Sequence, residues 1–385
     1  MNQVSKNVYY VGVNDCNLDL FEGIYKAPNG VSYNSYVIID ERIAVVDSVE
    51  EEFGDEWISN LKEVLNGREP DYLIIQHMEP DHSANALRFS QEFPNAKIVG
   101  NQKIFTMLNE YFATDFAEKR VVVADGQTLS LGRHELKFVF APMVHWPEVM
   151  FTYDSFNRTL FSADAFGKFG ALGTEDNWVD EARRYYFGIV GKYGKQVIAA
   201  LNKISSLDIS VICPLHGPVL DDNLGYYIGL YKTWASYAPE EDGVAIVYSS
   251  VYGHTKKAVE LLESKLLEKG LKKVKVYDII RDDRSLCVSE AFRYSKLVLA
   301  TTTYNAEIFP AMGEFIDCLT ARNFQNRTVA FIENGTWAPV AAKLMKAKLE
   351  KCSGLNFIEQ EVKIRSNLDS ESRAQLESLA VELGK

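Results

Sequence analysis

Short apolar runs separated by turn residues fill the first part of the chain, up to about residue 240. These runs are rich in Val, Ile, Phe and Tyr, and Gly, Asp, Asn or Pro bounds them, which is typical of β-strands. Two longer segments, 56–66 and 194–205, repeat apolar residues with the period of a helix. The pattern therefore predicts a β-rich part with interspersed helices. The predicted strands are 35–40, 43–48, 71–76, 97–100, 120–125, 136–142, 149–154, 159–164 and 209–214.

The pattern changes after the segment YAPEEDG, residues 237–243, whose Pro, Gly and acidic residues are typical of a domain edge. Beyond it, apolar strands alternate with helices, which predicts a doubly wound parallel sheet with the strand order 2-1-3-4-5. We therefore expect two domains, residues 1–241 and 242–385. The predicted strands of the second domain are 244–250, 273–279, 296–302, 328–334 and 356–364, and its helices include 255–270, 312–320 and 339–351.

Composition narrows the class of protein. The 385 residues are enough for two or three domains, and the net charge of -12 argues against nucleic-acid binding, which needs a basic face. No apolar stretch is long enough to span a membrane, and no secretory signal is visible, so we expect a cytoplasmic protein. The five cysteines are scattered without a CxxC pair, which argues against a disulfide framework and against a thiolate metal site.

Potential metal ligands are concentrated in the segment HMEPDH, residues 77–82, directly after a predicted strand. Further histidines and an aspartate lie at or just after the ends of other predicted strands. Because the loops at strand ends converge at one rim of a sheet, we expect these side chains to lie together. The candidate ligands are His77, Glu79, Asp81, His82, His145, Asp164 and His216.

A single histidine after a strand is more often a turn residue than a ligand, and for His134 we expect an exposed hairpin tip. The four histidines of the candidate set cannot all be turn residues. Packing them with three carboxylates and no cation would leave like charges uncompensated. The set contains nitrogen and oxygen ligands and no sulfur, which suits iron or manganese and also zinc. It is too large for one ion, so two metals that share a carboxylate fit better.

A second candidate site is the segment SSVYGHT, residues 249–255, between a predicted strand and a predicted helix. Backbone N–H groups and hydroxyls at a helix N-terminus can bind a phosphate without a cationic side chain, although a plain helix cap has the same sequence. The next two strands end in loops that flank the same point of the sheet. These loops carry Tyr304 and Trp337, whose flat side chains suit a flavin ring.

The metal-site motifs resemble those of the flavodiiron proteins. The segments HMEPDH, HWPEVMFTY, SADAFGKFG and PLHGPV all match that family, whose core is a metallo-β-lactamase-like αββα sandwich. Zinc-binding relatives of this fold have a histidine in place of Glu79, and a hard anionic oxygen there favours iron. The resemblance implies that His77, Glu79 and His145 hold one iron and that Asp164 bridges to the second. Asp81, His82 and His216 would hold that second iron, although the position of His82 is not always a ligand in the family. Trp146 and either Tyr185 or Tyr186 are candidate neighbours of the ligands, although aromatic residues of this kind more often pack in a core.

The second domain resembles flavodoxin, with FMN as its cofactor. Two departures from the family pattern occur, at Thr301–Thr303, where Ser-Pro-Thr is frequent, and at His254, where many relatives have Ser or Asn. The residues that the resemblance assigns to FMN are Ser250, Val251, Tyr252, Gly253, His254, Thr255, Thr303, Tyr304, Asn305, Ala306, Asn334, Gly335, Thr336 and Trp337.

Together the two resemblances imply a reductase of O2 to water, of NO to N2O, or of both. Electrons would come from a separate donor such as rubredoxin, because no CxxC pairs follow the flavodoxin-like part. The family also implies a head-to-tail homodimer or a dimer of dimers, in which the FMN of one subunit faces the irons of the other. Two alternatives are a di-zinc hydrolase fused to a flavodoxin module and an electron carrier whose first domain is structural; Glu79 and the complete ligand set argue against them.

Overall fold

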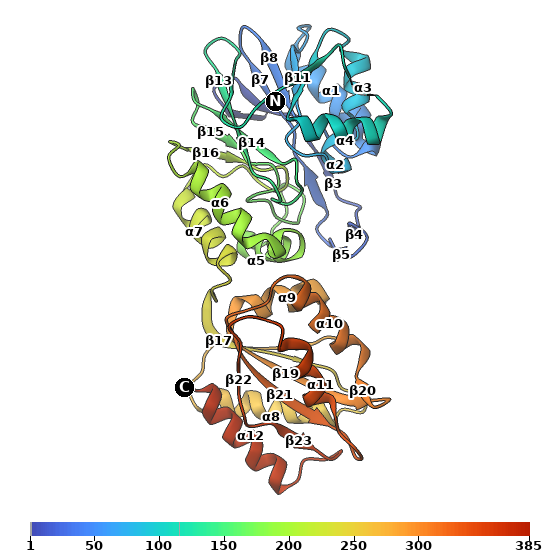
Figure 1. Ribbon diagram of the computed structural model, residues 1–385, viewed down its shortest axis with the longest axis vertical. Coiled ribbons are helices and arrows are strands. Elements are labelled where there is room, and N and C mark those ends of the chain that lie inside the picture. Colours follow the sequence, from blue (N-terminus) through green and yellow to red (C-terminus); the bar gives the residue numbers. More distant parts are fainter. Residues whose placement is uncertain (1, 115) are drawn as a thin grey trace. The chain divides into compact units, whose positions relative to one another are not determined.

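The computed structural model describes residues 2–114 and 116–385, which divide into two compact units, residues 1–232 and 233–385 (Figure 1). The division falls inside helix α7 (Leu224–Ala235), earlier than the boundary predicted at residue 241. Strand β17 (Glu241–Tyr248) begins where the sequence pattern changes. No helix of the described residues combines the length and the apolar character that are needed to cross a membrane.

The first unit is a sandwich of two sheets. The larger sheet has the strand order β1-β2-β7-β8-β9-β10-β11, and the smaller has the order β12-β13-β14-β15-β16. Apolar side chains of both sheets, such as Val37 and Phe138, share one buried core. The strands of the larger sheet are β1 (Asn2–Ser5), β2 (Val8–Tyr10), β7 (Tyr36–Ile39), β8 (Ile43–Val46), β9 (Tyr72–Ile74), β10 (Lys97–Gly100) and β11 (Arg120–Val122). Those of the smaller sheet are β12 (Thr128–Ser130), β13 (Glu135–Phe140), β14 (Met150–Asp154), β15 (Thr159–Phe161) and β16 (Val211–Cys213).

Helices cover both sheets of the sandwich (Figure 1). Helix α1 packs on β7, α4 packs on β10, and α6 packs on β13, so each outer face is shielded from water. The helices are α1 (Gly54–Leu65), α2 (Pro80–Ser83), α3 (Ala86–Glu92), α4 (Gln102–Phe112), α5 (Trp178–Tyr185) and α6 (Gly194–Ile204). Two small hairpins complete the unit, formed by β3 (Val13–Asp15) with β6 (Val31–Tyr33) and by β4 (Leu20–Phe21) with β5 (Tyr25–Lys26). This αββα architecture is the one predicted from the motifs.

The second unit contains a parallel sheet in the order β18-β17-β19-β21-β22, which confirms the predicted order 2-1-3-4-5. The last position of the sheet is shared by two short strands, β22 and β23, which both pair with β21. The strands are β18 (Val274–Asp278), β19 (Tyr294–Tyr304), β20 (Glu307–Ile308), β21 (Thr328–Asn334), β22 (Asn356–Phe357) and β23 (Val362–Ile364).

The helices of the second unit lie on both faces of its sheet (Figure 1). Helix α8 packs against α12 on one face, and α10 packs against α9 and α11 on the other. Buried Val244, Ile246, Val298 and Ile332 of the sheet pack in one core with Leu262 and other apolar residues of α8 and α12. The helices are α8 (His254–Glu268), α9 (Arg284–Arg293), α10 (Pro310–Ala321), α11 (Ala341–Leu349) and α12 (Ser370–Leu383).

Candidate metal centre and candidate flavin site

The seven predicted metal ligands lie together at one rim of the sandwich. The segment after β9 carries four of them, His77 and Glu79 in the loop and Asp81 and His82 in the short helix α2. The loops after β13, β15 and β16 carry His145, Asp164 and His216. Each group of donor atoms lies within 4.8 Å: His77, Glu79, His145 and Asp164 form one group, and Asp81, His82 and His216 form the other. All seven residues are buried.

Asp164 lies between the two groups, with one carboxylate oxygen toward each. Its Oδ2 is 3.3 Å from His77 Nε2 and 3.0 Å from His145 Nε2. Its Oδ1 is 3.3 Å from His82 Nε2 and 3.8 Å from His216 Nε2. A carboxylate placed in this way can bridge two cations.

The first group closes around Glu79, whose Oε2 is 3.3 Å from His77 Nε2 and 3.0 Å from His145 Nε2. The second group closes around Asp81, whose Oδ2 is 3.3 Å from both His82 Nε2 and His216 Nε2. Imidazole nitrogens also face one another at short range, with the Nε2 atoms of His82 and His216 only 3.1 Å apart. Lone pairs that converge from several sides on one point are an arrangement that suits a cation.

Unsatisfied polar atoms support the same interpretation. Among the described residues, both carboxylate oxygens of Asp81 and of Asp164 are buried without a hydrogen-bond partner. Buried polar atoms are almost always paired, because an unpaired one costs about 1–3 kcal/mol and a charged one costs more. A pair of metal ions would satisfy these oxygens, so the donor set fits two hard or borderline cations.

Hydrogen bonds to the backbone and to a further carboxylate orient two of the histidines. The Nδ1–H of His77 donates to Glu148 Oε1 at 2.8 Å, and that of His216 donates to the carbonyl of Ser32 at 2.8 Å. Each bond fixes the ring so that Nε2 points into the cluster, as ligating histidines require. Glu148 was not among the predicted site residues, although its place three residues after His145 in HWPE is a signal that could have indicated it.

The loop that follows His216 depends on a glycine. Gly217 has a φ of +78°, and a Cβ there would lie 2.7 Å from Cγ of the Lys168 side chain. Lys168 is buried and forms an ion pair with Asp176, at 2.7 Å from its Oδ1. The chain after Asp164 and the chain after His216 are thereby packed tightly together, which fixes both ligands.

The carboxylates of the cluster differ in the direction in which their pKa values are shifted. Burial opposes ionisation of Glu79, but hydrogen bonds from His145 and His77 outweigh it and hold the pKa of Glu79 below its usual range. Burial raises the pKa of Asp81 to about 8, and neighbouring Glu79 and Asp164 add to the effect. Burial opposes protonation of His145, but the nearby carboxylates of Asp164 and Glu79 outweigh it and raise the pKa of His145 to about 9. Without metals, the cluster therefore holds several protons at neutral pH.

Three further side chains, which were not predicted as ligands, lie at the cluster. Glu22, between β4 and β5, hydrogen-bonds Glu79, and its pKa is raised to about 8 by burial and then by Glu79. Tyr185 packs 5.4 Å from the ring of His216, and its buried hydroxyl has no hydrogen-bond partner among the described residues. Trp146 lies edge-on to His77, at 5.2 Å between ring centroids.

The expectation for His134 was wrong. This residue is completely buried, its Nδ1 lies 2.9 Å from Asp154 Oδ2, and its backbone N–H donates to Asp40. The hairpin between β12 and β13 folds against the loop between β7 and β8, because Arg42 N also donates to the carbonyl of Leu131. We expected exposure because His134 is a polar residue in a turn that contains glycine. Its carboxylate partner, Asp154, lies 20 residues away in the sequence, so the sequence did not indicate the contact.

A cavity of about 560 Å³ lies at the carboxyl ends of β17, β19 and β21 in the second unit. This volume lies within the usual range for a small-molecule or cofactor site. Thirteen of the fourteen predicted flavin residues line it, and Thr302, Ala338 and Ser366 complete the lining. The fourteenth, Gly253, precedes α8 with a φ of +87°, and its N–H donates to Ser250 Oγ at 3.1 Å.

The rim of this cavity exposes aromatic side chains. Trp337 is 82% exposed and Tyr252 is 91% exposed, which is unusual for large rings in the absence of a ligand. Asn305, Ala306 and Ala338 have positive φ values of 52°, 59° and 42°, so the ring loops hold strained backbone, as binding loops often do. Hydroxyls, amides and flat rings without a fixed cation suit a flavin mononucleotide.

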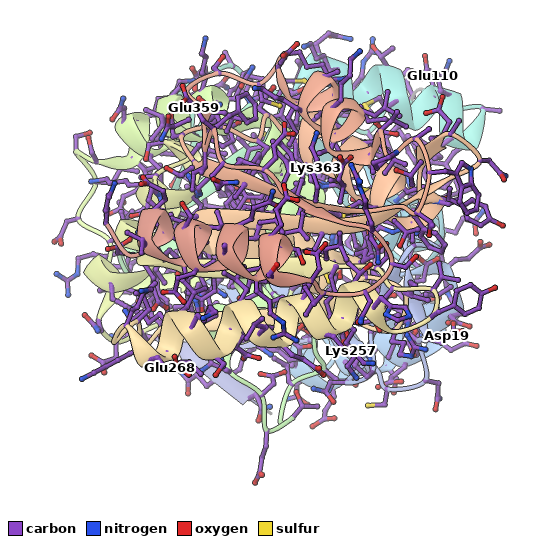
Figure 2. All side chains as sticks on the ribbon, turned by 90° about the horizontal axis from the view of Figure 1, so that it is seen from below. Asp19, Glu110, Lys257, Glu268, Glu359 and Lys363 are labelled. Atoms are coloured by element: carbon purple, nitrogen blue, oxygen red, sulfur yellow. The ribbon has the colours of Figure 1, made fainter. Side chains whose placement is uncertain are left out.

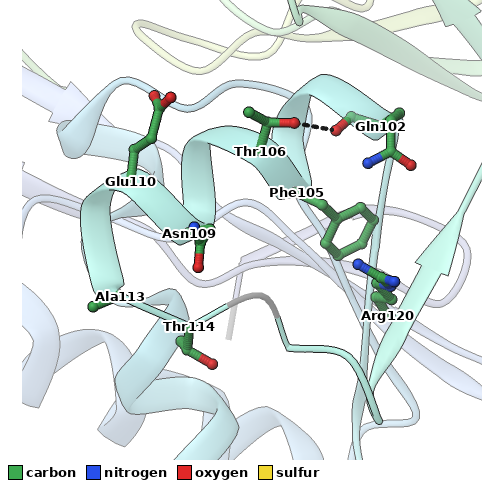
Figure 3. Close-up of a pocket in the computed structure, with 8 residues that line it drawn as sticks. All are labelled: Gln102, Phe105, Thr106, Asn109, Glu110, Ala113, Thr114 and Arg120. Atoms are coloured by element: carbon green, nitrogen blue, oxygen red, sulfur yellow. Dashed lines mark hydrogen bonds between the residues drawn. The ribbon is translucent and has the colours of Figure 1, made fainter.

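A separate cavity of about 590 Å³ lies beside α4 (Figure 3). Its lining is mostly polar and includes Gln102, Asn109, Glu110 and Arg120. Thr106 donates a hydrogen bond to the carbonyl of Gln102 across one turn of the helix (Figure 3). None of the predicted site residues lines this cavity.

The fold and the two sites define an oxidoreductase in which a metallo-β-lactamase-like unit is joined to a flavodoxin-like unit. A family model described as "ODP family beta lactamase" matches residues 31–217. The chain is 30% identical over 359 residues to a nitric oxide reductase of Moorella thermoacetica, which covers 90% of this chain and 89% of that protein. It is 27% identical over 380 residues to the anaerobic nitric oxide reductase flavorubredoxin of Salmonella arizonae, covering 95% and 79% of the two chains.

A solved structure leads to the same family. The flavodiiron protein from Giardia intestinalis has a TM-score of 0.86 and 26% identity, over 100% of this chain and 96% of that one. The chain belongs to the flavodiiron protein family. Proteins of this family carry FMN and a diiron centre, and both sites of this chain fit those groups. The relatives are oxidoreductases and do not favour the hydrolase alternative.

Proposed function

We propose that this chain reduces NO to N2O, O2 to water, or both, with one FMN in the cavity of the second unit and two irons in the first. The observation that carries the proposal is Asp164, which directs one carboxylate oxygen toward each half of the ligand cluster. The relative from Moorella thermoacetica is named a nitric oxide reductase, which supports the NO reaction in particular.

The ligand assignment follows the two groups of donor atoms. His77, Glu79 and His145 would hold one iron, and Asp164 would bridge to the other. Asp81, His82 and His216 would hold the second iron; His82 is included because its Nε2 faces both Asp81 and Asp164 at 3.3 Å. Oxygen donors such as Glu79 stabilise iron more than they stabilise softer metals.

When bound, the flavin and the iron pair supply the electrons and the gas-binding positions that these reductions require. The chain itself supplies the protons and the hydrogen bonds. Glu22, with its pKa raised to about 8, holds a proton on its carboxyl group at neutral pH beside Glu79. The Tyr185 hydroxyl keeps its proton because burial raises its pKa well above the usual value, so it is a hydrogen-bond donor in a dry pocket.

The electron source is a separate rubredoxin-type protein in this proposal. The relative from Salmonella arizonae is named a flavorubredoxin, which supports a donor of this chemical class. We further propose a head-to-tail homodimer or a dimer of dimers in the cytoplasm, in which the FMN of one subunit serves the irons of another. The two sites belong to different compact units of the chain, which is compatible with transfer between subunits.

Metal and flavin content tests the proposal directly. Protein purified from iron-replete cells should contain about two irons and one FMN per chain, measured by elemental analysis and a visible spectrum. Two zinc ions with little flavin would contradict the proposed function.

A further inference from the structure

The flavin cavity is lined almost entirely by uncharged side chains. Its sixteen lining residues include no Lys, Arg, Asp or Glu. The ionisable side chains of the lining are His254 and the phenols of Tyr252 and Tyr304. Phenols of ordinary tyrosines are neutral below about pH 9, so His254 is the one lining side chain whose type can become cationic near neutral pH.

His254 is placed at the part of the cavity that suits a phosphate. It is the first residue of α8, directly after Gly253, and the N-terminus of a helix of 15 residues favours an anion. Figure 2 shows this helix from below, with Lys257 near its first turn and Glu268 at its end. His254 therefore belongs to the first turn of α8, whose backbone N–H groups can also bind a phosphate.

The hydroxyls of Ser250 and Thr255 in this loop already have partners. Ser250 Oγ accepts hydrogen bonds from the N–H groups of Gly253 and Lys256, at 3.1 and 3.3 Å. Thr255 Oγ1 lies 3.3 Å from Thr302 Oγ1 and accepts from Asn334. In contrast, His254 Nδ1 is buried and has no hydrogen-bond partner among the described residues.

We propose that His254, when protonated, donates a charge-assisted hydrogen bond to the phosphate of bound FMN, so that lowering the pH strengthens FMN binding relative to a protein with a neutral residue at this position. The inference rests on the proposed function, because it takes FMN as the ligand of the cavity. Ser or Asn at this position would provide a neutral hydrogen bond, whereas a histidine adds one positive charge that depends on pH. The phosphate dianion in turn raises the affinity of the imidazole for its proton, as linkage requires.

The charges around the loop come from several elements. On α8 they are Lys256, which lies 3.8 Å from Glu260, and exposed Lys257. On β21, buried Glu333 accepts from the N–H of Ala342 and lies 3.8 Å from Lys363 of β23. At the end of β18 and after it, Asp278, Arg281 and Asp282 lie within electrostatic range of Tyr248, the last residue of β17 before the loop. These groups are the same in the wild-type protein and in variants at position 254, so a comparison of the proteins at each pH isolates the contribution of that position.

The test measures how fast FMN leaves the full-length holoprotein after dilution, using the rise in flavin fluorescence, together with FMN titrations at equilibrium. The variants are His254→Asn, which removes the charge, and His254→Lys, which keeps it at every pH of the series. Because the free phosphate itself titrates near about pH 6, the quantity compared is the ratio of dissociation constants of variant and wild type at each pH.

We expect the ratio for His254→Asn to be about tenfold at pH 5.5 and to approach one at pH 8.5, as the loss of one charge-assisted bond predicts. His254→Lys should bind FMN tightly at both pH values. Riboflavin, which lacks the phosphate, should bind wild type and both variants with the same pH dependence.

Two outcomes overturn the inference. One is a ratio for His254→Asn that does not change with pH, and the other is an equal loss of riboflavin affinity, which would assign the histidine to the ring or to the loop structure. Both leave FMN binding intact, and so they differ from failure of the proposed function, in which wild-type protein would bind no FMN at any pH.

Discussion

Replacing Glu148 with glutamine tests whether a carboxylate outside the ligand set controls the metal site. Glu148 Oε1 accepts two hydrogen bonds, from His77 Nδ1 and from the backbone N–H of Met78, both at 2.8 Å. The carboxylate is fully buried, and burial opposes its ionisation, but His77 and the Met78 N–H hold its pKa below the usual value. A glutamine oxygen can accept both bonds, so the substitution removes the charge and keeps the shape.

The expected size of the effect follows from the difference between hydrogen bonds to charged and to neutral acceptors. That difference is about 1–1.5 kcal/mol per bond, and for the His77 bond it corresponds to roughly tenfold in metal affinity. This value lies at the lower end of the ten- to hundredfold loss typical of such orienting groups. The Glu148→Ala variant also leaves the His77 and Met78 donors unpaired, so its free energy of unfolding should fall by a further ~2–4 kcal/mol.

The assay is an anaerobic competition between the protein and a chelator for ferrous iron, with thermal unfolding followed by circular dichroism as the test of folding. Glu110→Gln on α4 is the matched control, because it removes the same charge from an exposed residue that belongs to neither group of candidate ligands. If Glu148→Gln folds normally and binds iron within twofold of wild type, the orienting role assigned to Glu148 is refuted.

Three further predictions concern the two sites separately. Asp81→Asn should abolish NO and O2 consumption while FMN content stays normal; turnover that survives the change would disprove a metal-centred reaction. Burial raises the pKa of Asp81 to about 8, and the nearby carboxylates of Asp164 and Glu79 raise the pKa of His145 to about 9 against the effect of burial. Metal binding at pH 7 should therefore release more than one proton per chain, and metal affinity should fall as the pH falls below about 8. Calorimetry in buffers of different ionisation enthalpy measures this release, and a heat that is independent of the buffer would contradict it. Trp337→Ala should weaken FMN binding by roughly ten- to hundredfold, as loss of ~1–3 kcal/mol of ring stacking predicts, and leave iron content unchanged; an unaltered FMN dissociation constant would show that the indole does not contact the ring.

The sequence predicted the fold well because both units rely on patterns that are local. In the second unit, strands such as 244–250 and 328–334 are continuous apolar runs next to helices, and this pattern allows few topologies. The metal ligands were predictable for a related reason, since each of them lies in a segment that follows a strand of the sandwich. The distances that join Asp164 to both groups needed the structure, because they depend on four loops from separate parts of the chain.

The residues that were missed act through contacts between distant segments. Glu22 is on a hairpin whose sequence has no metal motif, and only the fold brings it to Glu79. His134 was expected in an exposed turn because its partner Asp154 is on another strand. Tyr185 was indicated only as an aromatic near the site, and its unpaired hydroxyl depends on packing that no period in the sequence records.

The central claim is that one chain joins flavin-derived electrons to gas reduction at the metal cluster. The most direct test is to reduce the iron- and FMN-loaded protein completely under argon, add NO in limiting amounts, and measure NO loss and N2O formation together with the flavin spectrum. The account predicts that two NO disappear for each N2O formed, with reoxidation of the reduced protein, and that Asp81→Asn protein consumes none. Reoxidation of the flavin without N2O formation, or equal NO consumption by the Asp81→Asn protein, would contradict it for NO; the same experiment with O2 should give water without peroxide.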